Sequence, residues 1–80
     1  MESVSSKTLN DAVKKTVKGF TPQQKSQYNY IVSKGYKPAV AAANVSRFPN
    51  TDFKSVGKMT APSRLNRLSN ARLMDQLKGL

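Results

Sequence analysis

Our prediction of the fold starts from residues Pro38–Ser46, whose sequence is PAVAAANVS. Proline suits the first position of a helix, and alanine is the best helix former. A run of alanines has little bulk, so we predict that a helix over Pro38–Ala43 lies unusually close to its neighbours. Asn44 tolerates a left-handed backbone better than most residues. We therefore expect a turn at Asn44, followed by Val45 as an apolar plug.

Two further helices are predicted on the N-terminal side of this stretch. From Thr8, a possible N-cap, apolar residues recur at spacings of three and four until Gly19, which predicts an amphipathic helix. The next helix has stronger signals. Thr21 and Gln24 can form a capping box around a proline at the first helical position, and Gly35 is a good residue to end the helix.

Two helices are predicted on the C-terminal side. The first covers Asp52–Met59, and a break over Thr60–Ser63 separates it from an amphipathic helix over Arg64–Leu80. The leucine stripe of the last helix either docks on the core or serves as an oligomerisation element. No lasting alternation of apolar and polar residues indicates a strand. We predict an all-α fold, a small bundle of four to five short helices with a helix-turn-helix-like pair.

The chain is expected to have three parts. Residues 1–7 are polar and serine-rich, which is typical of a disordered arm. Residues 8–59 form the helical core that we expect to bind DNA. Residues 60–80 form the C-terminal helix for docking or oligomerisation, so self-association through 65–80 is one expected use of this segment.

Composition excludes several classes of protein. The 80 residues contain no Cys, His or Trp, so neither a disulfide, a Cys/His zinc site nor a catalytic triad with histidine can form within them. We expect no enzyme activity, no metal and no other cofactor. No apolar stretch is long enough to span a bilayer, and the N-terminus lacks the apolar core of a signal peptide. The sequence thus predicts an intracellular protein that is not secreted and does not bind membranes.

The charge balance points to a negatively charged partner. The chain contains fourteen Lys and Arg residues but four Asp and Glu residues, which gives a formal net charge of +10. Such an excess repels itself in a compact chain, and a nucleic acid is the commonest partner that relieves it. The alternative is a merely solubilising surface, although such surfaces usually mix both signs.

The segment from Pro38 to Met59 favours a helix-turn-helix interpretation. The small face of the first helix, the turn at Asn44 and the plug at Val45 precede a second helix over Asp52–Met59, whose outward side chains would enter a major groove. Other cations would contact phosphates. The candidate DNA-binding residues are Arg47, Lys54, Ser55, Lys58, Lys37, Lys34, Arg64 and Arg67.

Four motifs occur in order along about half of the chain: the helix start FTPQQ at 20–24, the aromatic segment YNYIV at 28–32, the AVAAANVS motif at 39–46 and FKSVGKM at 53–59. Together they resemble the N-terminal domain of phage terminase small subunits. In that family, a helix-turn-helix-like domain binds viral DNA, and a later helical region forms rings. The resemblance implies double-stranded DNA as the partner and viral genome packaging or regulation, in the host cytoplasm or the virion, as the process.

A second function belongs to a different class. The chain is also compatible with a small basic viral structural or interaction protein. It would be a virion component, a scaffold or an inhibitor that docks on an acidic protein surface. The C-terminal leucine stripe and the N-terminal arm favour this alternative. Binding to a membrane surface is less favoured, because neither terminal helix has an apolar face rich in Trp and Phe.

Overall fold

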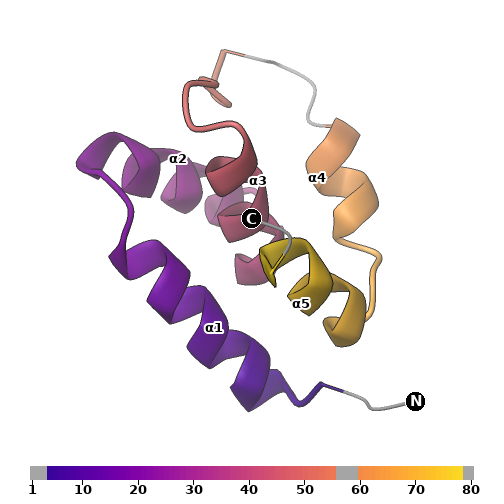
Figure 1. Ribbon diagram of the computed structural model, residues 1–80. Coiled ribbons are helices and arrows are strands. Elements are labelled where there is room, and N and C mark those ends of the chain that lie inside the picture. Colours follow the sequence, from indigo (N-terminus) through magenta and orange to yellow (C-terminus); the bar gives the residue numbers. More distant parts are fainter. Residues whose placement is uncertain (1–3, 56–59, 79–80) are drawn as a thin grey trace.

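The computed structural model describes residues 4–55 and 60–78, and within these ranges the protein is a small all-α bundle. The described residues form no strand. The fold class expected from the sequence is therefore confirmed. The helices, drawn in Figure 1, are α1 (Ser6–Lys18), α2 (Pro22–Ser33), α3 (Pro38–Arg47), α4 (Thr60–Leu65) and α5 (Asn70–Lys78).

The first helix begins earlier than expected. Ser5 is the N-cap of α1, and its Oγ accepts a hydrogen bond of 3.1 Å from the backbone N of Thr8. Val4 packs against the core, and its carbonyl oxygen accepts a bond of 3.3 Å from Nδ2 of Asn70. The arm that we expected over residues 1–7 therefore extends too far, since α1 already begins at Ser6. Serine caps a helix as well as threonine does, and Asn70 of α5 binds the backbone of Val4, the residue before the cap.

The second helix has the predicted boundaries. Gln24 N donates to Thr21 Oγ1 at 3.1 Å, and Thr21 N donates to Gln24 Oε1 at 2.9 Å, which completes the capping box. The helix ends at Ser33, and Gly35 follows with a φ of +95°. These features depend on residues within a few positions of each other, so the sequence predicts them well.

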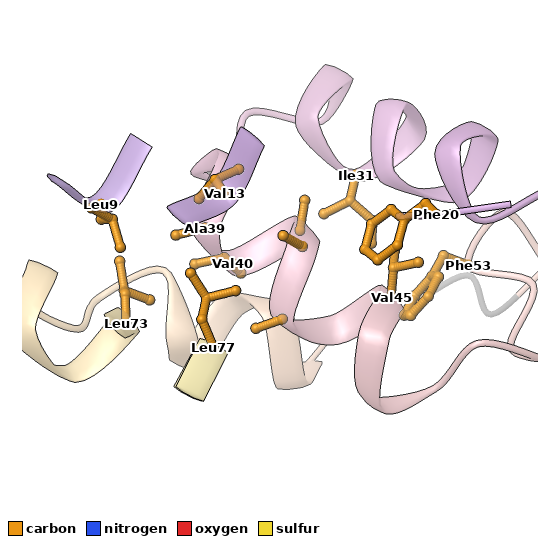
Figure 2. Close-up of a cluster of buried hydrophobic side chains, with 13 residues drawn as sticks. Leu9, Val13, Phe20, Ile31, Ala39, Val40, Val45, Phe53, Leu73 and Leu77 are labelled. Atoms are coloured by element: carbon orange, nitrogen blue, oxygen red, sulfur yellow. The ribbon is translucent and has the colours of Figure 1, made fainter. Parts of the chain in front are cut away.

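Helix α3 is the centre of the bundle and contacts α1, α2, α4 and α5 (Figure 1). Every side chain from Ala39 to Val45 is buried. Its alanines leave room for several neighbours to approach the same short helix, as expected. The core around it takes residues from every side of the bundle, and Figure 2 shows Leu73 of α5 pointing toward Leu9 of α1 at one end of this cluster.

The predicted turn at Asn44 is wrong. Asn44 lies inside α3, which continues to Arg47, and no residue other than glycine has a positive φ in the described parts of the chain. The side chain is 2% exposed, and its Nδ2 donates to the carbonyl oxygen of Val40 at 2.8 Å. The helix itself therefore provides a hydrogen-bond partner for the buried amide of Asn44, so the helical backbone conformation is compatible with burial of this side chain.

The predicted helix over Asp52–Met59 does not begin where we expected it. Asp52–Ser55 is a turn closed by a bond of 3.1 Å from Ser55 N to the Asp52 carbonyl oxygen. Oε1 of Gln27 accepts from Phe53 N at 2.8 Å, so a side chain of α2 holds the backbone of this turn. Residues 56–59, including Lys58, lie outside the described residues. Phe53 of this turn is buried in the core.

The predicted break over Thr60–Ser63 is also wrong, because these residues lie within α4. A proline in the first turn of a helix interrupts no internal hydrogen bond, since the first N–H groups have no partner there. The break falls instead between α4 and α5, where Ser69 Oγ accepts from Arg72 N at 3.4 Å. Helix α5 docks on the core through Leu73 and Leu77.

Candidate nucleic-acid interface

The candidate DNA-binding residues that the structure describes fall into two groups, one at each end of α3. The group at the N-terminal end consists of Lys34, Lys37, Arg64 and Arg67, and all four residues are exposed. We call it the two-turn surface, because it combines the α2–α3 turn with the segment that joins α4 to α5. The second group consists of Arg47, Lys54 and Ser55.

Hydrogen bonds hold the two-turn surface together across long separations in sequence. The backbone N of Lys37 donates to Asn66 Oδ1 at 2.8 Å, and its Nζ donates to the Leu68 carbonyl oxygen at 3.3 Å. Nearby, Tyr36 Oη and Ser63 Oγ are 2.9 Å apart. The cations of the α2–α3 turn are therefore held beside those of the α4–α5 segment.

Glycine makes the tight α2–α3 turn possible. Gly35 has a φ of +95°, a conformation in which a Cβ atom would be strained. The turn joins Ser33, the last residue of α2, to Pro38, the first residue of α3. Lys34 and Lys37 therefore both belong to this turn. Lys34 Nζ also lies 5.4 Å from the centroid of the Tyr30 ring, which is a cation–π contact.

The local charge of the two-turn surface is positive only. Neither of the segments 34–37 and 63–68 contains an Asp or a Glu. The backbone N of Arg67 donates to the carbonyl oxygen of Arg64 at 3.2 Å, so the two arginines stand at the two ends of one backbone turn. Exposed arginines and lysines in segments that contain no carboxylate are suited to phosphate contacts.

In the group at the C-terminal end of α3, the side chains of Arg47 and Ser55 make hydrogen bonds within the chain. Nη1 of Arg47 donates to Gln76 Oε1 at 2.7 Å. Ser55 Oγ donates to Asp52 Oδ2 at 2.7 Å, and Lys54 N donates to Asp52 Oδ1 at 3.1 Å. These bonds lower the pKa of the Asp52 carboxyl, with the hydroxyl of Ser55 as the largest cause.

The two groups are separated by the length of α3. Its ten residues rise about 15 Å, so one short helix face does not carry both groups. The groove-reading helix that we expected is absent from the described part of the segment, Asp52–Ser55. Sequence reasoning missed Asn66 and Ser63 as residues that organise the surface. No local signal identifies them, since their partners are distant in sequence.

Positive side chains also occupy a third region, the outer face of α1. Lys14 and Lys18 are exposed there, while Leu9 and Val13 of the same helix are buried. The positive charge is therefore not gathered on one face of the molecule. This distribution provides a control, because charges can be changed on α1 without disturbing the two-turn surface.

Two other classes of site are absent from the described residues. No helix among them is long and apolar enough to cross a membrane. Residues 4–55 and 60–78 also contain no group of carboxylates that would hold a metal ion.

Comparison with known proteins finds no matching family model, no matching curated protein and no matching solved structure. The resemblance to phage terminase small subunits accordingly rests on the quoted motifs alone. One of these motifs, AVAAANVS, lies within one continuous helix that is buried from Ala39 to Val45, instead of forming a helix followed by a turn.

Proposed function

We propose that this chain is a non-enzymatic protein that binds double-stranded DNA through the two-turn surface. The observation that carries the proposal is the pairing of the α2–α3 turn with the α4–α5 segment. The bond from Lys37 N to Asn66 Oδ1 joins the two, and four exposed cations lie on them. Neighbouring phosphates of a DNA strand recur at short, regular intervals, and a fixed cluster of cations neutralises several at once.

The overall charge supports the same partner. A net charge of +10 on 80 residues attracts a polyanion over long distances and accelerates its association. Arginine and lysine contacts to phosphate position a protein without reading sequence, so we propose binding with little base specificity at this surface. The absence of His and Cys from the sequence is consistent with binding in place of catalysis.

The biological process is proposed from the resemblance. If the motifs reflect a relationship with terminase small subunits, the chain acts in packaging or regulation of a viral genome, in the host cytoplasm or the virion. In that family, assembly into rings accompanies DNA binding. Mass measurement in solution tests this point, and a strict monomer at all concentrations would count against the ring-forming relationship.

The test of DNA binding is a salt titration with paired variants. We expect the affinity for duplex DNA to fall steeply between about 50 and 200 mM salt, because bound counterions are released from several phosphates. Arg64→Glu with Arg67→Glu should weaken binding at least about tenfold more than Lys14→Glu with Lys18→Glu. The two double variants change the net charge equally, so the comparison isolates position from charge.

A third double variant tests the other end of α3. Arg47→Glu with Lys54→Glu should weaken duplex binding no more than the α1 variant does. If the Arg47 and Lys54 variant instead has the larger effect, the duplex binds at the C-terminal end of α3, as the sequence suggested. Circular dichroism checks that each variant keeps its helix content.

A docking protein is the second candidate function. Charge complementarity to an acidic protein surface uses the same exposed cations. This candidate replaces DNA binding if the chain binds duplex DNA no better than heparin of equal charge. It also replaces DNA binding if all three double variants have the same affinity for duplex DNA.

A further inference from the structure

The described parts of the chain expose one large apolar side chain, Phe48, which is 50% exposed. Single apolar residues on a surface are common and need no explanation by themselves. Phe48 differs from such residues in two respects, the rigidity of its backbone and the charges beside it.

The backbone that carries Phe48 is fixed on both sides. Phe48 N donates to the Asn44 carbonyl oxygen at 2.9 Å, which is the last helical bond of α3. Thr51 N donates to the Phe48 carbonyl oxygen at 3.1 Å and closes a turn around Pro49. Proline at this position of a turn restricts the backbone further.

A second set of contacts anchors the far end of this turn. Phe53 is buried in the core beside α3 (Figure 2), and its backbone N is bound to Gln27 Oε1 at 2.8 Å. Gln27 Nε2 donates to Asp52 Oδ1 at 3.4 Å. The exposed phenyl ring therefore projects from a turn that α2 and α3 hold in place, and it needs little ordering before it binds a flat partner.

The charges near Phe48 favour an anionic partner. Arg47 precedes it directly, and Lys54 follows after the turn, while Asp52 contributes the one negative charge of this segment. The carboxylate of Asp52 is engaged by Ser55 Oγ at 2.7 Å and by the backbone of Lys54. Exposed cations thus flank the exposed ring in the sequence, and proteins combine aromatic rings and cations to bind the bases and phosphates of unpaired nucleic acid.

We infer that Phe48 stacks on an unpaired base of DNA, with Arg47 and Lys54 contacting the flanking phosphates. This inference deepens the proposed function and rests on it. It assigns to the C-terminal end of α3 a ligand different from the one at the two-turn surface. The partner is a single strand or a duplex with an extruded base, whereas the two-turn surface contacts the backbone of paired DNA.

The test uses the absence of tryptophan from the chain. In the Phe48→Trp variant the new indole is the sole tryptophan, and its fluorescence reports stacking directly. The probes are an oligonucleotide of about 16 nucleotides, its duplex, and the same duplex with one looped-out base. We expect strong quenching with the single strand and the looped-out duplex, weak quenching with the paired duplex, and none in a control variant, Asn29→Trp, at an exposed position of α2.

Binding constants of truncated variants provide the second measurement. Phe48→Ala should weaken binding of the single strand by about 5-fold to 100-fold, and Phe48→Leu should weaken it nearly as much, because leucine keeps apolar bulk without a ring. Binding to the paired duplex should not change. Since the ring is half exposed, both variants are expected to fold, and circular dichroism verifies this.

The possible failures are distinguishable. If duplex and single strand both fail to bind the unmodified chain, the proposed function is wrong. If DNA binds but the indole of the Phe48→Trp variant is not quenched and Phe48→Ala binds the single strand normally, only the stacking inference is overturned. If Phe48→Ala lowers the mass of the protein in solution without DNA, a second copy of the chain covers the ring, which also overturns it.

Discussion

Lys37 and Asn66 are joined by a hydrogen bond of 2.8 Å from the backbone N of Lys37 to Asn66 Oδ1, although 29 positions separate them in the sequence. This bond fastens the start of α3 to the segment between α4 and α5. It satisfies a backbone donor at a helix N-terminus that has no partner within the helix. It also positions the cations of the two-turn surface relative to one another.

Removing this bond should loosen the two-turn surface. We expect Asn66→Ala to lower the free energy of unfolding by about 1 kcal/mol, because water replaces the lost acceptor only in part. Asn66→Asp keeps an acceptor oxygen and should retain most of the stability. It should nevertheless weaken DNA binding by adding a negative charge beside Arg67. Urea unfolding and the salt titration measure the two effects, and equal stability of Asn66→Ala and the unmodified chain would show that the bond contributes nothing.

The buried amide of Asn44 should be dispensable as long as its volume is kept. Leucine has a similar shape and buries no polar group, so we expect Asn44→Leu to be neutral or stabilising. Asn44→Asp places an acceptor and a charge against the Val40 carbonyl oxygen and should destabilise the fold by about 3 kcal/mol or more. Thermal unfolding at neutral pH tests the pair. A severe loss in Asn44→Leu would mean that the amide has another essential partner.

The alanines of α3 should resist enlargement. Ala42 is completely buried, so Ala42→Leu forces its neighbours apart and should cost about 1–3 kcal/mol of stability. The matched control is Asn29→Leu on the exposed side of α2, which adds similar bulk outside the core. Urea midpoints of the two variants should differ clearly, and similar midpoints would contradict the central position of α3.

Two glycines should respond oppositely to alanine. Gly35 has a φ of +95° and open space where a Cβ atom would lie, so Gly35→Ala should cost about 1–2 kcal/mol through backbone strain alone. Gly19 has a φ of −84°, and the nearest atom to its Cβ would be the Thr16 carbonyl oxygen at 3.6 Å, an ordinary contact. Gly19→Ala should be neutral or stabilise the fold by about 0.4–1 kcal/mol. Thermal unfolding of both variants decides the matter.

The carboxyl of Asp52 should titrate below its usual pKa of 3.8, first because Ser55 Oγ donates to it and then because of the bonds from Lys54 N and Gln27 Nε2. A pKa that is lower in the folded state means that the associated stability is present above pH 3.8. That stability is lost as the pH falls through the folded pKa. NMR titration should show the Asp52 pKa rising toward 3.8 in Ser55→Ala, and an unchanged pKa would remove the hydroxyl as its cause.

The helix with the strongest local signals, α2, was predicted nearly to the residue. The capping box of Thr21 and Gln24 and the glycine at position 35 define α2 without help from the rest of the chain. The candidate site was predicted only as a set of residue types. That Lys37 lies beside the segment of Arg64 and Arg67, whereas Arg47 lies at the opposite end of α3, follows from contacts between residues 26 to 31 positions apart.

The all-α class, the positive charge and the ends of α2, whose capping donors and acceptors lie three residues apart, could be read from the amino-acid sequence. Only the packed bundle brought Lys37 beside Asn66 and Phe53 beside Gln27, and with them the cations of the two-turn surface. The physical reason is the hydrogen-bonding choice of each polar side chain. A cap finds its partner one turn away, whereas Gln27 and Asn66 bind backbone donors that only the packed bundle brings within reach.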